Sequence, residues 1–460
     1  MLTIYRSNKA EWLAEILGQE LRLNPPEITE EVNIIVSTWP SSRWLSEKLS
    51  IINNINALVK YPFPGTYLKR LVKRIIGIDP DEKDPWEKNQ LVWNILELLP
   101  ELMKEEEAQV IRSWLKISDK ENAQINLNLW DLANNIAETF DDYILYRPEI
   151  IKQWLSKKTK KKSREISVNK NILWQEILFN LLYKKINKDP FCIQVEKAIQ
   201  RLKKDDISKL DYPKNLYIYG ISSLAPLQID LIQAFSKVIN IKIYLISPCN
   251  DLWQRCEARR LQFRNTWNTP PDRQWLLESP RLEAFLGRMG AEYQQLLEGS
   301  GEYQLGDRNE EDIFSLTADI ATNKGNKPNL LEQLQQELLS TKSESILTKE
   351  KSDKSLLFLK SPGKYRQVEL IRDHILQLFS NDKKLQPRDI LIMTPQVDSY
   401  APIVTSVFNN IDHNTTQLPW VITDKSQEDK VGLIHFVLNL LEISASRLTA
   451  SIFENLLTNP

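Results

Sequence analysis

The chain has 460 residues, enough for roughly two to four structural units, and its 42% apolar and 26% charged residues are typical of globular proteins. Its 60 basic and 61 acidic residues give a net charge of −1, which excludes a global attraction to nucleic acid or membrane surfaces. Three cysteines and three histidines show no metal-ligand spacing, and no apolar run approaches the roughly 18 residues of a membrane span, which indicates a cytoplasmic protein.

Apolar runs with strand character are few, and long helical stretches separate them. The first four runs occupy residues 2–5, 34–37, 216–219 and 241–246. Their β-branched residues follow one another closely, which is typical of parallel strands that helices bury on both faces. Three further runs predict strands of a second α/β unit, at residues 356–359, 390–393 and 420–422.

Residues 67–210 carry almost no strand signal and predict an all-helical insertion within an α/β domain. One helix start is well marked, because Asp84 can cap it and Pro85 suits its first turn. The helices expected in this insertion occupy residues 85–99, 127–146 and 171–183.

Beyond the fourth strand, residues 251–340 form a second helical region that includes a helix over 330–339. The polar residues 341–355 are predicted to be a linker, because they contain little apolar material. The basic run at 157–164 is expected to be a solvated loop, with a DNA phosphate contact as the alternative.

The turn after the strand at 34–37 is the place where a P-loop protein would hold phosphate. A P-loop needs G-x-x-x-x-G-K-[ST], whose backbone N–H groups and lysine bind the phosphate oxygens. The turn here reads WPSSR from Trp39 to Arg43, without glycine or lysine. The strand at 216–219 is followed by Gly220 rather than by acidic residues that would hold Mg²⁺. Both halves of a nucleotide-hydrolysis site are therefore missing from the sequence.

No other catalytic pattern replaces them. Asp81, Glu82 and Lys83 match the D-x-K of metal nucleases, but they lie in a proline-bounded loop rather than on a strand. No G-x-S-x-G motif and no H-E-x-x-H pair occurs. The sequence therefore predicts no catalytic residue, cofactor site or metal site in this chain.

Tryptophan is abundant, with 13 residues. We expect most of them to be core anchors between helices, and some to stack on bases of single-stranded nucleic acid. Those in polar helical surroundings are Trp86, Trp93, Trp114, Trp130 and Trp154.

Short blocks in a fixed order extend over nearly the whole chain. They include YRSN at 5–8, ST at 37–38 with WL at 44–45, YPFP at 61–64, FDDYILYRP at 140–148, GISSLAP at 220–226, PRDILIM at 387–393 and LPWVITD at 418–424. In this order they resemble the N-terminal part of the gamma (RecC) subunit family of exodeoxyribonuclease V, the bacterial helicase–nuclease that processes double-strand breaks. Members of that family are more than twice as long as this chain, so it is expected to be a fragment or a truncated gene product.

The resemblance implies the fold of a degenerate superfamily 1 helicase: α/β with large all-helical insertions, and a P-loop-type parallel sheet without a working P-loop. It divides the chain into a helicase 1A-like domain, a helical 1B-like insertion, a helical segment, a linker and the start of a truncated 2A-like α/β domain. The corresponding residues are 1–66 with 211–250, 67–210, 251–340, 341–355 and 356–460.

The resemblance also implies a non-catalytic DNA-binding and scaffold subunit in double-strand-break repair by recombination. Such a subunit splits the duplex end and guides the 3′-ended strand while scanning it for the signal Chi. Its partners would be a RecB-like helicase–nuclease and a RecD-like helicase, which use ATP and Mg²⁺, together with double-stranded DNA ends and single-stranded DNA.

Five residues in or beside these blocks are candidates for a DNA-binding channel. Thr38 and Arg43 stand where a motor has its phosphate loop. Phe63, between two prolines, is an aromatic ring suited to stacking on a base, with a core position as the alternative. Asp141 can accept from a base amino group, and Arg147 can bind guanine or phosphate or cap a helix C-terminus.

Two other hypotheses remain open from the sequence. One is an AddB-like helicase–nuclease subunit whose nuclease lies in a C-terminal part that this chain lacks. The other is a truncated protein-interaction remnant with no role on DNA. A nuclease motif with an iron–sulfur cysteine set downstream would favour the first, and undetectable affinity for DNA ends at low salt would favour the second.

Overall fold

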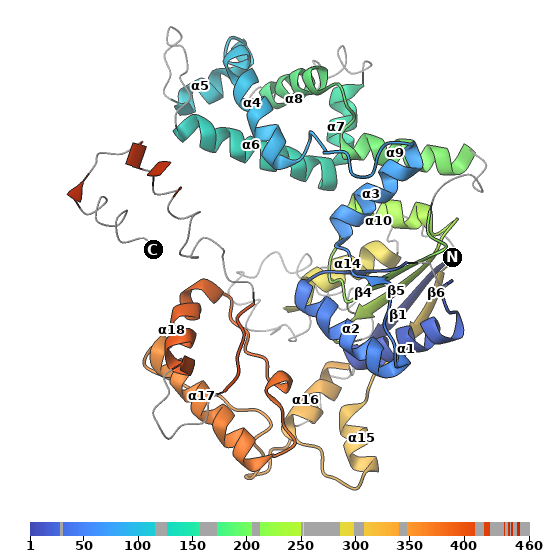
Figure 1. Cartoon of the computed structure of the whole chain (residues 1–460), viewed down its shortest axis with the longest axis vertical. Coiled ribbons are helices and arrows are strands. Elements are labelled where there is room, and N and C mark those ends of the chain that lie inside the picture. Colours follow the sequence, from blue (N-terminus) through green and yellow to red (C-terminus); the bar gives the residue numbers. More distant parts are fainter. Residues whose placement is uncertain are drawn as a thin grey trace, which may run out of the picture. The chain divides into compact units, whose positions relative to one another are not determined.

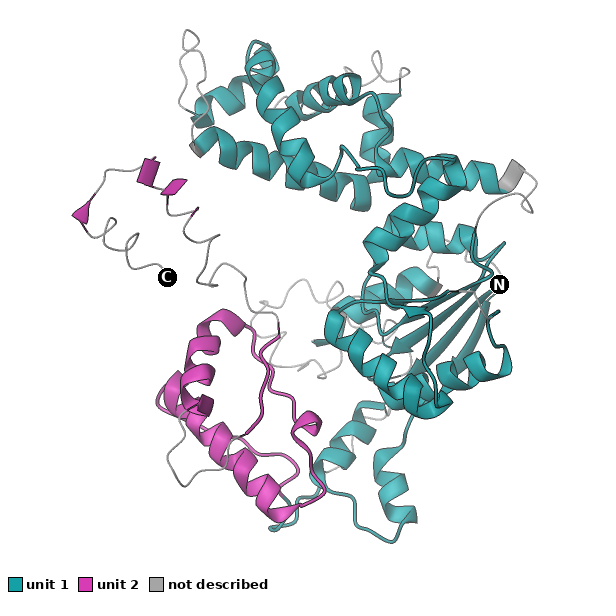
Figure 2. Cartoon of the chain, viewed as in Figure 1, with its two compact units in different colours: residues 1–353 teal, residues 354–460 magenta. Residues whose placement is uncertain are grey.

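The computed structural model divides the chain into two compact units, residues 1–353 and residues 354–460 (Figure 2). The basic run at 157–164 lies outside the residues that the structure describes. The described residues are 1–27, 31–115, 127–156, 173–204, 212–249, 252, 286–298, 308–339, 347–409, 418–423 and scattered positions between 437 and 450.

Unit 1 is built on a six-stranded parallel sheet in the order β3-β2-β4-β5-β1-β6 (Figure 1). The predicted parallel sheet is confirmed, and its strands coincide with the first four expected runs at β1, β2, β4 and β5. Leu2 lies opposite Ile241, so the N-terminus and the chain after the helical region share one sheet. The strands are β1 (Leu2–Ser7), β2 (Val32–Val36), β3 (Val59–Lys60), β4 (Asn215–Tyr219), β5 (Asn240–Ile246) and β6 (Arg308–Asp312).

The edge strand β6 was not predicted, because its sequence RNEED has no apolar residue. Charge pairing holds it instead: Arg6 on β1 contacts Glu310 Oε2 at 2.7 Å and Asp312 Oδ1 at 2.6 Å. The N–H of Ile313 also donates to the Arg6 carbonyl at 2.8 Å. The expectation that residues 251–340 contain helices alone is therefore corrected by one strand, which a search for hydrophobic patterns could not detect.

Helices cover both faces of the sheet, and β2 shows how the faces divide. Ile34 and Val36 pack with α1 and α2 in one hydrophobic cluster, whereas Ile35 packs with α3 and α10 in a second cluster. This alternation follows from the two-residue period of a strand. The four helices are α1 (Ala10–Leu23), α2 (Trp39–Asn53), α3 (Pro64–Ile76) and α10 (Pro226–Phe235).

Between α3 and β4 the described residues form a helical region without strands. The helix expected at 127–146 is confirmed, whereas the one expected from 85 begins at Lys88. The reason is that Asp84 Oδ1 accepts the N–H of Trp86 at 3.0 Å in a turn before the helix. The helices are α4 (Lys88–Leu102), α5 (Gln109–Leu115), α6 (Leu127–Tyr146), α7 (Pro148–Leu155), α8 (Leu173–Ile186) and α9 (Phe191–Lys204), with a 3-10 turn at Glu106–Ala108.

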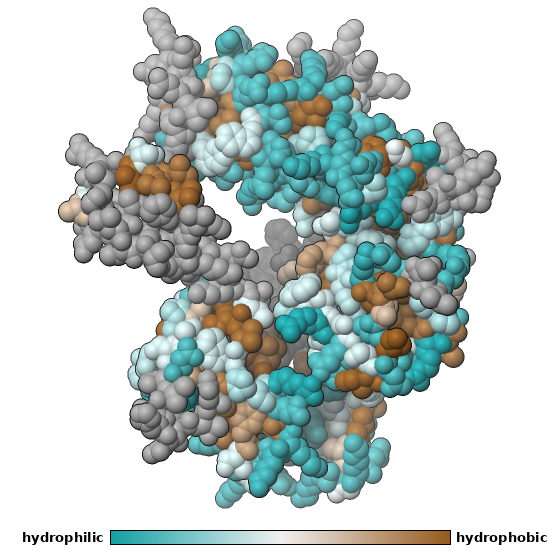
Figure 3. Space-filling model, viewed as in Figure 1, coloured by the Kyte–Doolittle hydropathy of each residue, from teal (hydrophilic) through white to brown (hydrophobic). Residues whose placement is uncertain are grey.

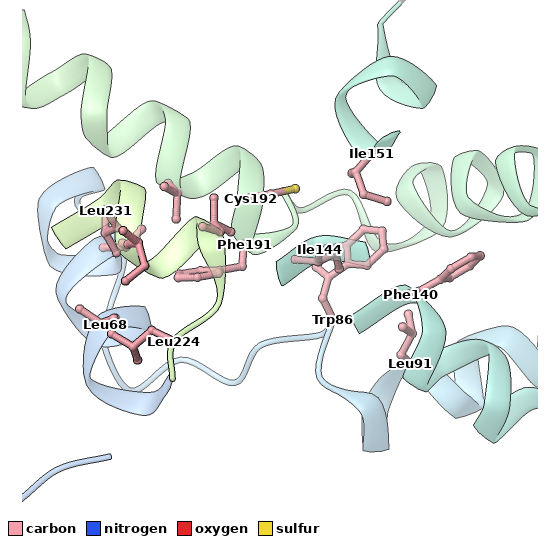
Figure 4. Close-up of a cluster of buried hydrophobic side chains, with 14 of the residues drawn as sticks. Leu68, Trp86, Leu91, Phe140, Ile144, Ile151, Phe191, Cys192, Leu224 and Leu231 are labelled. Carbon is pink, nitrogen blue, oxygen red and sulfur yellow. The ribbon is translucent and has the colours of Figure 1, made fainter. Parts of the chain in front are cut away.

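One hydrophobic cluster joins this helical region to the sheet (Figure 4). Leu68 on α3 and Leu231 on α10 lie at one end of it, and Phe140 on α6 and Trp86 lie at the other. Phe191 at the start of α9 lies between them. The sheet domain and the helical region therefore share a continuous core.

The tryptophans of the helical region divide between core and surface. Trp86 and Trp154 pack in the shared core, as expected for anchors. Trp93, Trp114 and Trp130 are exposed, so these three are not core anchors, and stacking of some tryptophans on bases stays a prediction. Trp93 shows the reason: the helical period of α4 turns its neighbours inward and this ring outward, where it meets Trp130 with centroids 5.1 Å apart.

A glutamine joins two helices near the end of unit 1. Gln336 Oε1 accepts the backbone N–H groups of Ala318 at 2.8 Å and Asp319 at 3.0 Å, and Gln336 Nε2 donates to Asp319 Oδ1 at 2.9 Å. These bonds satisfy amides in the first turn of α15, which otherwise lack helical partners. The helices that follow β5 in the described residues are α14 (Arg288–Glu298), α15 (Thr317–Asn323) and α16 (Leu330–Leu339), the last as predicted.

Unit 2 contains α17 (Lys364–Asn381), α18 (Val397–Asn409) and a 3-10 turn at Pro387–Asp389. The runs predicted as strands at 356–359, 390–393 and 420–422 pair with no strand in the described part of this unit, so that prediction is wrong here. Ile390 and Trp420 pack on the helices while Leu391 and Val421 are exposed. Other hydrophobic residues are also exposed at the surface of both units (Figure 3). Without a neighbouring ladder, a β-branched run has no backbone partners that would make it a strand.

Substituting Gly18 by alanine is expected to destabilise unit 1 by about 1–3 kcal/mol through overpacking, despite the better helix propensity of alanine. The added Cβ would lie 2.7 Å from Ile52 Cγ2, in the contact between α1 and α2. Urea unfolding would measure the loss. Gly65→Ala is the matched control, because nothing lies within 4 Å of its added Cβ in α3, and it should be neutral or stabilising. Equal stability of the two variants would contradict the argument.

Candidate nucleic-acid interface

Helix α2 begins just after β2, and side-chain hydrogen bonds cap its first turn. Thr38 Oγ1 accepts the N–H of Ser41 at 3.3 Å and lies 2.7 Å from Ser41 Oγ. Ser42 Oγ donates to the Trp39 carbonyl at 2.7 Å. Pro40 in the same turn has no N–H to donate. Thr38 is therefore the N-cap of α2, and it occupies an amide that a phosphate oxygen would use in a P-loop.

A groove of about 930 Å³ lies along α2 and the loop that follows it. Trp39, Arg43 and Trp44 line it together with the carboxylate of Glu47. Lys48 lies beside the lining, with its Nζ 5.8 Å from the centroid of the Trp44 ring. The pairs 39/43 and 44/48 are each four residues apart, so each aromatic ring shares a helix face with a cation. Trp39 is 66% exposed and free to stack on a planar partner. Exposed rings beside cations can bind the bases and phosphates of single-stranded nucleic acid.

Hydrogen bonds order another part of the groove lining. Asn56 Nδ2 lies 2.8 Å from Ser46 Oγ, 3.2 Å from the Ser46 carbonyl and 3.1 Å from Tyr61 Oη. Burial raises the pKa of Tyr61, and the hydrogen bonds with Asn56 and Ser46 partly offset this effect. The phenol therefore remains neutral at physiological pH and presents a polar, uncharged edge to the groove.

Phe63 follows the groove residue Tyr61 by two positions and is 45% exposed, so the alternative of a core position is wrong. It is the N-cap residue of α3, and its carbonyl accepts the N–H of Tyr67 at 3.0 Å. The carbonyl of the preceding Pro62 accepts the N–H of Val36 at 3.2 Å, which ties this turn to β2. The backbone around Phe63 is thereby fixed while its ring remains accessible.

The other two candidates lie in the helical region and not in the lining of the groove. Asp141 on α6 is half-buried near Lys69 of α3 and near other carboxylates. Arg147 is exposed between α6 and α7, where its backbone N–H donates to the Tyr143 carbonyl at 3.0 Å. The structure thus brings Thr38 and Arg43 together on α2, with Phe63 on a neighbouring turn, and leaves Asp141 and Arg147 in a separate part of unit 1.

Asp141→Asn is expected to stabilise the chain at pH 7. Burial is the main cause of the raised pKa of Asp141; Lys69 lowers it, and Asp142, Asp84 and Glu87 raise it further. When the pKa of a carboxyl is higher in the folded chain than in the unfolded chain, the folded chain becomes less stable as the pH rises through these two pKa values. The neutral amide avoids this loss, so its advantage in urea unfolding should disappear at about pH 3, below the ordinary pKa of an aspartate. An equal advantage at both pH values would contradict this assignment.

Trp39, Trp44 and Tyr61 line the groove and Lys48 lies over the Trp44 ring, but none of the four is among the residues predicted from the sequence. A signal for three of them was present: two aromatic–basic pairs at i and i+4 within one amphipathic segment. Tyr61 carries no such signal, because it reaches the groove through the loop after α2.

The described residues contain no group of three or more side chains suited to holding a metal ion. Their helices also include none with the length and apolar composition needed to cross a bilayer.

A comparison with protein families matches residues 2–341 to the family described as RecC, N-terminal domain. The chain belongs to the RecC family. This confirms the resemblance inferred from the ordered sequence blocks.

RecC proteins from several bacteria are similar over nearly the whole chain. The RecBCD enzyme subunit RecC of Haemophilus influenzae is 24% identical and that of Escherichia coli is also 24% identical, covering 98% and 97% of this chain. The RecBCD enzyme subunit RecC of Mycobacterium tuberculosis is 26% identical over 99% of this chain. The matches cover 43%, 41% and 40% of these relatives, so the chain spans about two fifths of their length.

Proposed function

We propose that this chain is a DNA-binding and scaffold part of a RecBCD-type helicase–nuclease that acts in double-strand-break repair by recombination. In this role it splits the duplex at a DNA end and guides the 3′-ended strand while scanning it for Chi, without a motor or nuclease site of its own. The observation that carries the proposal is the groove along α2, which aromatic rings and Arg43 line, in a chain of the RecC family.

The groove suits a single strand better than a duplex. Each base offers a flat face to Trp39 or Phe63, and this stacking tolerates any sequence. Arg43 in the lining and Lys48 beside it outnumber the one lining carboxylate, Glu47, and a chain with a net charge of −1 needs such local positive charge if it is to bind phosphate. Thr38 would contribute at the start of α2, and Asp141 and Arg147 would contact the strand farther along the helical region.

A helicase-like origin accounts for the position of the groove. A parallel sheet with a helix starting just after β2 is the arrangement that carries a P-loop in nucleotide motors. On this view residues 1–66 with 211–250 are 1A-like and residues 67–210 are a 1B-like insertion. Residues 251–340 follow as a helical segment, a linker spans 341–355, and residues 356–460 begin a 2A-like domain.

The names of the relatives supply the proposed partners. As a RecBCD subunit, the chain would assemble in the cytoplasm with a RecB-like helicase–nuclease and a RecD-like helicase. Those partners would use ATP and Mg²⁺, and the assembly as a whole would be exodeoxyribonuclease V.

Co-elution tests the proposal directly. The chain would be mixed with the RecB-like subunit from the same genome and a labelled forked DNA end, then separated by size. We expect one peak containing both proteins and DNA, and no ATP turnover by the chain alone. A blunt hairpin without single-stranded tails is the control and should bind more weakly. A well-folded chain that elutes apart from both the subunit and the fork would contradict the proposal.

A further inference from the structure

A second cavity, of about 360 Å³, lies in the helical region. Its lining comes from the end of α3, the loop before α4, α8, the turn between α8 and α9, and α9. These segments are far apart in sequence and are brought together by the packing of α3 against α9. The size of the cavity matches a small ligand or a single chemical group of a larger one.

Lys73 is the unusual residue of this cavity. It is 8% exposed, yet it takes part in no ion pair within the described residues. Its Nζ donates to the backbone carbonyl of Glu82. An ammonium group has three N–H donors, and burying it costs free energy unless an opposite charge compensates.

The carboxylates in the wall of the cavity are already engaged by other lysines. Tyr183 also donates to Asp189 Oδ1 at 2.9 Å. Lys69 and Lys197 reach their partners from outside the lining, which leaves Lys73 and Lys83 without an ion pair among the described residues. The hydrogen bond and charge of Lys188 are the main causes of the lowered pKa of Glu82, and Lys73 helps to lower this pKa only at longer range. The pairs are Glu82 with Lys188 at 2.6 Å, Asp84 with Lys69 at 3.4 Å, and Asp189 with Lys197.

We propose that this cavity binds a phosphate group, with the Lys73 ammonium as its buried anchor and Lys83 as a second cation at the surface. A phosphate oxygen would accept the N–H donors of Lys73 that the Glu82 carbonyl leaves unused. The side-chain amide of Asn187 in the same lining can donate as well, and so can the second N–H of Gln194 Nε2, whose first N–H donates to the Asp189 carbonyl at 2.7 Å. This inference is independent of the proposed function, because it concerns a different part of unit 1.

Inorganic phosphate is the first probe. The unfolding temperature of the full 460-residue chain would be measured in phosphate and in chloride at equal ionic strength, with affinity from calorimetry. We expect a phosphate-specific rise for the unmodified chain and an affinity about tenfold lower in Lys73→Met, from the lost charge-assisted bonds. Arg70→Met is the matched control, because it removes an exposed cation from the same helix, and it should change affinity less than about twofold.

A second variant keeps the test decisive if the buried substitution prevents folding. Lys83 is exposed, so Lys83→Met should fold and should weaken phosphate binding by about two- to fivefold. The proposal is overturned if the unmodified chain shows no preference for phosphate over chloride. It is also overturned if a folded Lys73→Met chain binds phosphate as well as the Arg70→Met chain does.

The source of the phosphate group is resolved by competition. A 5′-phosphorylated oligonucleotide, the same oligonucleotide without its phosphate, and ribose 5-phosphate would each be tested against bound inorganic phosphate. Displacement by the phosphorylated oligonucleotide alone identifies a DNA end as the ligand. Displacement by ribose 5-phosphate without any effect of DNA identifies a small phosphate ester, and both results support a phosphate site.

Discussion

Replacing Trp39 by alanine is expected to weaken the affinity of the chain for single-stranded DNA by roughly 5- to 150-fold, because one stacked base contributes about 1–3 kcal/mol. The ring is 66% exposed at the first position of α2, so its removal leaves the core intact. Fluorescence anisotropy with a labelled oligothymidine at fixed low salt would measure the change.

Trp93→Ala is the matched control for this experiment. Trp93 is 61% exposed on α4 and lies outside the groove, so the same substitution there removes a similar amount of exposed aromatic surface. We expect its DNA affinity to stay within about twofold of the unmodified chain, the change expected for a surface substitution that makes no contact with the ligand. A similar loss of DNA affinity in both variants would mean that exposed tryptophans bind DNA non-specifically, wherever they lie, rather than through the groove. A Trp39→Phe chain that keeps most of the affinity would support stacking.

Trp86→Ala is expected to destabilise unit 1 by about 3–5 kcal/mol, the range for removing a large buried aromatic side chain. Trp86 is 2% exposed and stacks on Phe179 with centroids 4.9 Å apart. Its Nε1 donates to the Lys188 carbonyl at 2.9 Å. The substitution therefore opens a cavity where α6, α8 and the loop before α4 meet, and it leaves a carbonyl without its donor. Urea unfolding followed by circular dichroism would measure the loss.

Trp86→Phe separates the two contributions. A phenyl ring keeps much of the apolar contact with Phe179 but removes the hydrogen bond, so we expect a smaller loss of about 1–3 kcal/mol. Trp93→Ala again serves as the surface control; it removes only the edge contact with Trp130, so the unfolding free energy should fall by no more than about 0.5–1.5 kcal/mol. A loss below about 1 kcal/mol in Trp86→Ala would show that this part of the helical region is not a packed core.

The parts of the fold that could be predicted are those whose apolar residues follow the spacing of a buried strand or of an amphipathic helix. Runs such as 34–37 and 241–246 are apolar because helices cover both faces of their strands, and such a run can be recognised in the sequence alone. Strand β6 could not be predicted, because Arg6 and two acidic residues hold it across 300 positions of sequence. Residues 390–393 have strand composition, but composition does not supply the neighbouring ladder that makes a strand.

The candidate site could be predicted in part for similar reasons. Arg43 and Phe63 were identified through sequence blocks, and the structure shows one in the groove and the other exposed nearby. The sequence indicates the contact of Lys48 with Trp44 only through their separation of four residues on a helix. It gives no sign of the contact between Asn56 and Tyr61, because that contact depends on how the loop after α2 folds. The buried Lys73 gives no signal in sequence, because a lysine near a helix end is ordinarily a solvated charge.

The continuous core between the sheet and the helical region limits how this protein can vary. Leu68 and Leu231 belong to the layer that covers the sheet, and they pack in the same cluster as Phe140 and Trp86. The helical region between α3 and β4 is therefore not a separable unit that could be exchanged between relatives at its two ends. A transplant that carries only the inserted residues would leave mismatched surfaces on α3 and α10. A functional chimera would have to exchange those two helices together with the insertion.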